Sequence, residues 1–207
     1  MNDNLNTDKT YVVAITGASG SIYGIRLIAA LSETFARVLV ILSRSGRKVL
    51  AHEMGMGPND TLQDLLYRYG VSKEGLGRIE TFDQEEIASA PASGSFIHHG
   101  MAVVPCSMKT LAAVSGGFAD NLITRACDVS LKEKRPVILV PRETPFSLIH
   151  LENMTRAARA GAVILPPSPS FYTFPATVDE LVDTVVARVL DHLGADHNLA
   201  RRWGQES

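Results

Sequence analysis

Five short runs of consecutive apolar residues, many of them β-branched, limit the fold of this chain more than any other feature. They are Tyr11–Thr16, Arg37–Leu42, Met101–Cys106, Pro136–Val140 and Ala162–Leu165. The runs are continuous rather than alternating, which is typical of strands covered on both faces of a parallel sheet. Helix-like segments lie between them, and this alternation predicts a doubly wound α/β fold. We therefore expect three layers built around a mostly parallel, Rossmann-like sheet.

The last helix is the clearest one in the sequence. Its apolar stripe consists of Val178, Leu181, Val182, Val185, Val186, Val189, Leu190 and Leu193. These positions share one helical face, and Thr177 and Glu180 precede them at capping-box spacing. Another helix is predicted from Ser147 to near Gly161. The segment from Gly55 to Phe82 predicts a helix, loops and an edge strand.

Composition narrows the class of protein. The chain has 207 residues and a formal net charge of −2, with no block of Lys and Arg, which disfavours a nucleic-acid partner. No apolar run reaches the roughly 18–20 residues that a membrane span needs, and the polar start lacks signal-peptide features. Two cysteines and six scattered histidines form no disulfide framework and indicate no metal. We expect a cytoplasmic protein with a disordered tail over 1–10, one domain over 11–195 and a C-terminal tail over 196–207.

Polar or small residues follow the predicted strands. Gly17-Ala18-Ser19, Ser43, Ser107 to Thr110, and Arg142-Glu143 each come directly after an apolar run. Ligands of open α/β sheets bind beyond the carboxyl ends of the strands. The sequence therefore predicts a ligand site at this edge, although loops carry polar residues in any case.

The first turn is the most specific local signal. Gly17 and Gly20 permit a tight turn, and the following helix offers N–H groups and a positive dipole end to an anion. The Gly-Lys-Ser/Thr ending of a Walker loop is missing. We expect a nucleotide-like ligand here; the alternative is that the glycines only let the strand turn into a helix. Ser107 has a similar alternative as a helix N-cap.

Two further patterns have simple alternatives. Arg125 and Lys132 share a helical face, yet Asp128 between them also fits a solvated ion-pair network. Tyr69 and Lys73 match the catalytic pair of short-chain dehydrogenases, but they lie too close to Gly17 in sequence for that fold. Arg44 could suit a 2′-phosphate, so an NADP-dependent reductase remains a rival.

Several spaced motifs together resemble the UbiX-type flavin prenyltransferases of the flavodoxin-like flavoprotein superfamily. The resemblance runs from about Tyr11 to Trp203. The motifs begin at Thr16 (TGASGSIYG), Ser93 (SGSF), Pro105 (PCSMKTL), Thr124 (TRACD), Leu131 (LKEKRP), Arg142 (RETP) and Pro166 (PPSPSFY). The resemblance implies a homododecamer that joins a dimethylallyl group from dimethylallyl phosphate to N5 and C6 of reduced FMN, without a metal. The product would serve a UbiD-type decarboxylase.

The resemblance also implies roles for individual residues. Binding of FMN would fall to Gly17, Ala18, Ser19, Ser43, Ser107, Met108, Lys109, Thr110 and Arg142. The prenyl phosphate would be bound by Tyr172 and Arg188, with Trp203 closing the site. The family's polar active-site positions match Ser19, Glu53, Arg125, Lys132 and Glu143. Pro105-Cys106-Ser107-Met108 replaces the Pro-x-Met-Asn motif of cysteine decarboxylases, which disfavours decarboxylation.

The proposed chemistry suits these residue types. Without a metal, Arg125, Lys132 and Arg188 would stabilise the leaving phosphate, with Tyr172 and Ser19 donating hydrogen bonds. Glu143, Glu53 or the released phosphate could accept the proton lost from C6. The alternatives are Glu143 as a structural partner of Arg142 or Arg125, a surface Glu53 and a solvated Arg188. A non-catalytic flavin carrier remains a rival, and the donor could be a monophosphate or a diphosphate.

The segment Leu165–Pro175 holds four prolines and three aromatic residues. That is more apolar surface than an exposed loop usually carries. We expect the segment to be buried between subunits, so that the active site is shared.

Overall fold

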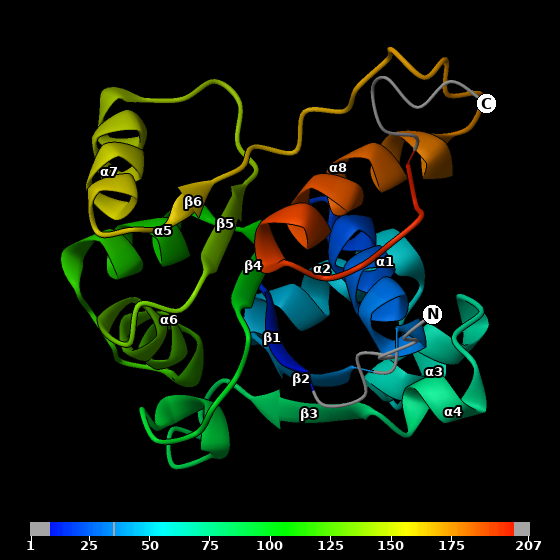
Figure 1. Cartoon of the computed structure of the whole chain (residues 1–207), viewed down its shortest axis with the longest axis horizontal. Coiled ribbons are helices and arrows are strands. Elements are labelled where there is room, and N and C mark those ends of the chain that lie inside the picture. Colours follow the sequence, from blue (N-terminus) through cyan, green and yellow to red (C-terminus); the bar gives the residue numbers. More distant parts are fainter. Residues whose placement is uncertain (1–8, 35, 201–207) are drawn as a thin grey trace, which may run out of the picture.

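Strands and helices alternate along the chain as predicted (Figure 1). The computed structural model describes residues 9–34 and 36–200, so Trp203 and nearly all of the expected N-terminal tail lie outside the described residues. The strands are β1 (Thr10–Ile15), β2 (Arg37–Leu42), β3 (Ile79–Asp83), β4 (Met101–Cys106), β5 (Val137–Pro141) and β6 (Val163–Ile164). The helices are α1 (Ser21–Glu33), α2 (Arg44–Met54), α3 (Leu62–Arg68), α4 (Lys73–Leu76), η1 (Ala90–Ala92), α5 (Met108–Gly116), α6 (Leu122–Lys132), α7 (Leu148–Arg159) and α8 (Val178–Leu193).

The six strands form one sheet in the order β3-β2-β1-β4-β5-β6, and every pair is parallel. This is the Rossmann strand order, so the predicted doubly wound fold is confirmed. The order reverses between β1 and β4. Side chains of β1 and β4 are buried on both faces, which explains why these strands read as continuous apolar runs.

Two helical layers cover the sheet. The residues of α1, α3 and α8 join one apolar core, and those of α5 and α6 join the other. Figure 1 shows the same division, with α1 and α8 on one side of the strands and α5, α6 and α7 on the other. The chain therefore leaves β1 and β4 towards opposite faces. In open α/β sheets the ligand-binding crevice forms at such a divergence, beyond the carboxyl ends of the strands.

Close packing of α1 on the sheet depends on Gly24. A Cβ atom at this position would lie 2.5 Å from the carbonyl oxygen of Val104 in β4. Ile25, Ile28 and Leu31 then bury completely against the sheet, each contributing about 1.5–3 kcal/mol. The small residue lets the helix approach the strand, and this fixes where α1 begins at the sheet edge.

The segment from Gly55 to Phe82 contains the edge strand β3 that the sequence predicted. It also contains two short helices, α3 and α4, where one was expected. Only Ile79 and Phe82 of β3 are buried, so the strand has no continuous apolar run. In α8 the predicted stripe is buried from Val182 onward, whereas Val178 is exposed. Within the described ranges, no helix is long and apolar enough to cross a bilayer.

Candidate functional site

Arg142 links the ends of three central strands. It follows β5, its backbone N–H donates to the carbonyl of Cys106 at the end of β4 (3.3 Å), and its Nε donates to the carbonyl of Ser19 after β1 (3.1 Å). The side chain therefore reaches across the end of β4 to the turn after β1. The structure brings Arg142 and the turn Gly17–Ser19 together, as the sequence predicted, but it gives no ion pair between Arg142 and Glu143.

The turn after β1 also packs tightly against the start of α2. The backbone N–H of Ser43 donates to the carbonyl of Ile15 (3.1 Å), and a Cβ atom at Gly17 would lie only 2.4 Å from Cβ of Ser45. Gly17 is therefore required by its neighbour, independently of any ligand. Ser43 lies beside the turn as predicted, where its hydroxyl caps α2 by accepting from the N–H of Gly46 (2.9 Å).

Glu53 occupies the N-terminus of α1. Its carboxylate accepts hydrogen bonds from the N–H of Gly20 (3.0 and 3.1 Å) and from the N–H of Ser21 (2.8 Å). Burial alone would raise the pKa of Glu53, but hydrogen bonds from Ser19, Ser21 and Gly20 outweigh it and hold that pKa below its ordinary value. The sequence predicted that these amides face a bound anion. The protein's own carboxylate holds them instead, which satisfies the orphan donors of the helix.

A buried polar side chain joins the ends of β1 and β4 below the expected crevice. The hydroxyl of Thr16 donates to the carbonyl of Pro105 (2.7 Å) and accepts from the N–H of Ser107 (2.8 Å). Thr16 is almost completely buried. The turns at Gly17 and Ser107 therefore follow two strands, β1 and β4, whose ends are joined by the side chain of Thr16.

The N-termini of α2 and α5 supply donors to the same edge. Ser43 and Ser107 each cap their helix with one side-chain bond, Ser107 to the N–H of Thr110 (3.3 Å). A single cap leaves other first-turn N–H groups to solvent or a ligand. Two positive helix ends, hydroxyl groups and the Arg142 guanidinium lie at the same edge of the sheet, and this donor set fits a phosphate-bearing ligand. Met108, Lys109 and Thr110 lie in the first turn of α5, as predicted.

Arg125 and Lys132 lie on α6. Arg125 bonds to the carbonyl of Ala92 (3.3 Å) and pairs with Asp128 (3.2 Å), and Lys132 pairs with Glu133 (2.9 Å). The predicted pair of Arg125 with Asp128 is therefore present, whereas Lys132 takes Glu133 as its partner instead of Asp128. Glu143 is exposed after β5, and its side chain accepts the N–H of Thr144 (3.0 Å).

Arg188 lies on the opposite face of the sheet, because α8 and α6 belong to different cores. Its Nη1 is 2.7 Å from Asp191, whose other oxygen is 3.0 Å from Nε2 of His197. One protomer therefore does not gather Arg125, Lys132 and Arg188 around a single ligand.

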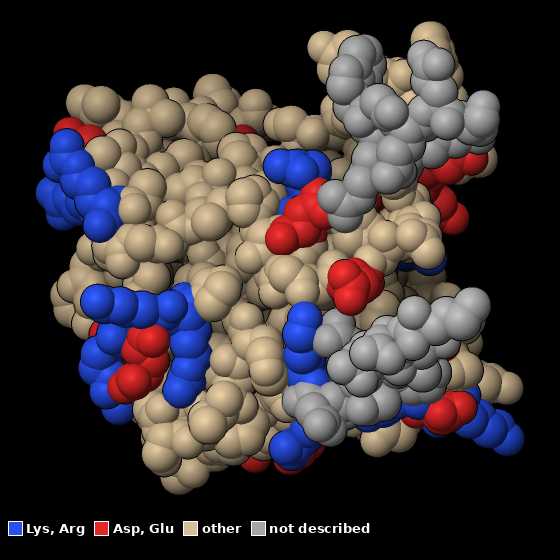
Figure 2. Space-filling view, viewed as in Figure 1, with Lys and Arg blue, Asp and Glu red and all other residues tan. Residues whose placement is uncertain are grey.

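Tyr172 belongs to an exposed apolar segment that runs from β6 to α8 (Figure 1). The exposed fractions of Phe171, Tyr172 and Phe174 are 68%, 78% and 90%. The segment is nevertheless attached to the body, since the N–H of Ser170 donates to the hydroxyl of Thr184 in α8 (3.0 Å). Figure 2 shows few charged side chains over the neighbouring region of β5 and β6, and Leu148 and Ile149 at the start of α7 are also exposed.

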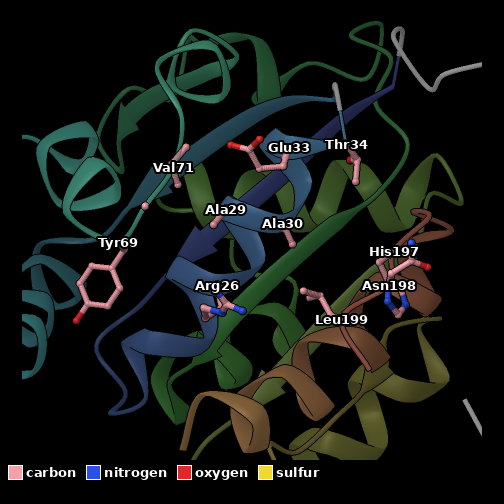
Figure 3. A pocket seen from close by; sticks show the side chains of 11 residues that line it. Arg26, Ala29, Ala30, Glu33, Thr34, Tyr69, Val71, His197, Asn198 and Leu199 are labelled. Carbon is pink, nitrogen blue, oxygen red and sulfur yellow. The ribbon is translucent and has the colours of Figure 1, made fainter. Parts of the chain in front are cut away.

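One cavity lies outside this edge. It has a volume of about 270 Å³ and is bounded by the second half of α1, the turn 69–71 and residues 197–199. In Figure 3, Arg26, Ala29 and Ala30 of α1 line it opposite Leu199. Arg26 is already held by both oxygens of Asp183 (2.9 and 2.7 Å). We place the functional site at the sheet edge and not in this cavity.

The fold and the crevice define the class of protein: the flavoprotein family model matches residues 2–190, and the chain is a flavoprotein. Among curated relatives, the flavin prenyltransferase UbiX of Archaeoglobus fulgidus is 46% identical and covers 94% of this chain and 99% of its own length. This chain belongs to the family of UbiX-type flavin prenyltransferases.

Solved structures agree with this assignment. AnUbiX (PadA1) in complex with FMN and dimethylallyl pyrophosphate superimposes with a TM-score of 0.84 at 38% identity, covering 97% of this chain and 100% of that chain. A dodecameric FMN-dependent UbiX-like decarboxylase from Escherichia coli O157:H7 has a TM-score of 0.80 at 40% identity, covering 94% and 98%. The predicted fold and family are therefore confirmed.

Sequence reasoning assigned no role to two residues at the edge. Thr16 and Ser45 flank the glycine turn in space, and only Thr16 flanks it in sequence. A hydroxyl directly at the end of a buried apolar strand was an available signal for Thr16. Ser45 had none, because its contact with Gly17 depends on how α2 packs.

Proposed function

We propose that this chain transfers a dimethylallyl group from dimethylallyl phosphate to N5 and C6 of reduced FMN, as a metal-independent prenyltransferase. One observation carries the proposal: the turns after β1, β2 and β4 and the side chain of Arg142 converge on one crevice rich in hydrogen-bond donors. Reduced FMN supplies the nucleophilic ring. The family membership and the relative that holds FMN and dimethylallyl pyrophosphate support this reaction.

The flavin would lie across the carboxyl edge of the sheet. Backbone and side-chain donors of Gly17, Ala18 and Ser19, of Ser43, and of Ser107 to Thr110 would bind its phosphate and tail. Arg142 already bonds to Ser19, so it would orient the ring edge and hold the turn at once. Because Glu53 fills the N-terminus of α1, the phosphate would use the helix ends of α2 and α5.

The leaving phosphate needs cationic and hydroxyl groups as charge builds on it. We assign this role to Arg125, Lys132, Arg188 and Tyr172. Arg125 and Lys132 lie on the opposite face of one protomer from Arg188, so at least two copies would contribute to each site. The exposed segment around Phe171 to Phe174 would pack between copies, in a dodecamer like that of the Escherichia coli relative. Trp203, outside the described residues, would close the site.

Glu143 is our choice for accepting the C6 proton. Glu53 accepts hydrogen bonds from several donors that hold its carboxylate in place, which makes it a weak base. Glu143 accepts the backbone N–H of its neighbour Thr144 and is exposed on the loop beside Arg142. The assignment gives Glu53 and Ser19 a supporting role, in which they shape the turn under the flavin.

The proposal is tested by incubating the protein anaerobically with reduced FMN and dimethylallyl phosphate and weighing the flavin by mass spectrometry. Addition of a C5 unit is expected. Tight binding of an unchanged flavin would favour a carrier, and binding of NADP without flavin affinity would favour a reductase. A parallel reaction with the diphosphate identifies the donor, and loss of CO₂ from a cysteine-containing peptide would favour a cysteine-type decarboxylase.

The product would leave for a second protein. A prenylated flavin is a cofactor and not an end product, so we propose that a UbiD-type decarboxylase in the same cytoplasm accepts it. Transfer is testable by mixing the product complex with such an apo-decarboxylase and measuring the release of CO₂ from its substrate.

A further inference from the structure

Thr16 stands where the two central strands separate. The pairing of β1 with β4 ends at Ala14 and Val103, and beyond it the chains leave for opposite faces of the sheet. The pairing of β4 with β5 is also irregular between Val103 and Cys106. Pro105 has no N–H to donate. The sheet therefore loses its regular hydrogen bonds just below the proposed flavin crevice.

Thr16 supplies hydrogen bonds between β1 and β4 where the regular pairing of the strands has ended. Its backbone N–H and its hydroxyl both donate to the carbonyl of Pro105 (3.3 and 2.7 Å), and its oxygen accepts the N–H of Ser107 (2.8 Å). Only 1% of Thr16 is exposed, so water cannot take over these bonds. The hydroxyl uses its proton and one of its two lone pairs.

The same bond fixes Ser107 from outside its helix. The hydroxyl of Ser107 is used within α5, where it caps the N–H of Thr110 (3.3 Å) and meets the Thr110 hydroxyl (3.0 Å). Its backbone is held by Thr16. Thr16 is also joined in sequence to Gly17, whose turn packs closely against Ser45 and accepts a hydrogen bond from Arg142.

We infer that Thr16 is a positioning residue for flavin binding: its buried hydroxyl sets the separation between the turn at Gly17–Ser19 and the turn at Ser107–Thr110. Thr16 need not touch the flavin. A pre-formed pair of turns binds a rigid ligand more tightly, because the ordering cost has been met before binding. This inference rests on the proposed flavin site at these two turns.

Thr16→Val removes the hydroxyl and keeps the shape of the side chain. We expect the dissociation constant for FMN, titrated by fluorescence into the apo-protein well below its melting temperature, to rise about 10-fold or more. Thr16→Ser keeps the hydroxyl and is expected to stay within about 3-fold of the wild type. At saturating FMN the valine variant should keep kcat within about 3-fold while its KM for FMN rises, since the reacting groups are unchanged.

Ser130→Ala is the matched control. The Ser130 hydroxyl is also fully buried, donates to the carbonyl of Ala126 (2.6 Å) and meets Nε2 of His98 (3.2 Å), remote from the crevice. It is expected to lower the melting temperature without changing FMN affinity. Should Thr16→Val fail to fold, Thr16→Cys provides a weak thiol donor and acceptor in its place, with an expected loss of about 3- to 10-fold.

The outcomes distinguish the proposed flavin site from the role of Thr16 within it. A wild-type protein that binds no FMN would overturn the proposed function. A wild type that binds FMN, together with valine or cysteine variants that bind it equally well, would overturn the role of Thr16. A valine variant that is less stable but has unchanged affinity would reduce Thr16 to a purely structural residue and would also reject the inference.

Discussion

Oε2 of Glu53 lies 2.8 Å from the backbone nitrogen of Ser21, so a side chain of α2 caps the N-terminus of α1. Gly20, the N-cap residue of α1, provides no side chain for this purpose. We predict that Glu53→Ala lowers the free energy of unfolding by about 1–2 kcal/mol, measured by urea denaturation at pH 7. Glu152→Ala, at an exposed carboxylate of α7, is the control and should change it by less than about 0.5 kcal/mol. Equal effects would contradict the capping role.

The contact between Gly17 and Ser45 predicts that a substitution at Ser45 restores stability lost by a substitution at Gly17. Gly17→Ala places a methyl group 2.4 Å from Cβ of Ser45, and this overpacking should cost about 1–3 kcal/mol of stability and weaken FMN binding. Ser45→Gly in the same chain removes the opposing atom. A double-mutant cycle, measured by thermal unfolding and by FMN titration, should therefore give a favourable coupling free energy between the two substitutions of about 1 kcal/mol or more. Strictly additive effects would show that the clash relaxes by another route.

Glu143→Gln tests the proposed proton acceptor. The amide keeps the size of the side chain but cannot take a proton, so product formation should fall about 10²–10⁴-fold. FMN affinity should stay within about 2-fold, because the proposed binding turns are untouched. Single-turnover reactions followed by mass spectrometry provide the measurement, and unchanged rates would remove Glu143 from the mechanism.

Arg125 and Arg188 lie on helices that cover opposite faces of one protomer. If each site combines Arg125 of one copy with Arg188 of another, then Arg125→Ala and Arg188→Ala chains should each be nearly inactive alone. Co-expressed, they should recover roughly a quarter of the wild-type activity, since random assembly rebuilds that share of the sites. Mixed assemblies as inactive as their parents would place both groups in one protomer.

His98 predicts an acid-sensitive fold. It is buried, with Nδ1 near the carbonyl of Gly100 and Nε2 near Ser130. Burial, aided by the charges of Arg135 and His99, lowers the pKa of His98 to about 4. The unfolded chain therefore binds this proton first, and stability should fall by up to about 3 kcal/mol as the pH drops from about 6.5 to 4. His98→Gln should flatten that part of a urea-based stability profile; an unchanged slope would assign it to other groups.

The sheet was readable from the sequence because its central strands are buried on both faces. Runs such as Arg37–Leu42 must then be apolar throughout, and turns with small or hydroxyl residues must follow them. β3 was harder to place, since an edge strand with only Ile79 and Phe82 buried keeps little of this signal.

The long-range contacts that shape the site could not be predicted from local sequence patterns. Glu53 binds residue 20 across 33 positions, and Arg142 binds Ser19 across 123. Such partners are set by helix packing and strand order, which local periodicity does not encode. The resemblance to a family named the polar residues, but only the fold divides Arg125 and Arg188 between opposite faces.

The aromatic segment between β6 and α8 also bears on how the protein must be handled and made. Phe171, Tyr172 and Phe174 are presented to water on a backbone already fixed by Ser170 and Thr184. A newly synthesised chain would thus expose an apolar surface as soon as it folds. Assembly of the subunits would then compete with aggregation. Slow synthesis at low temperature should raise the yield of well-formed particles, because it keeps the concentration of solitary chains low.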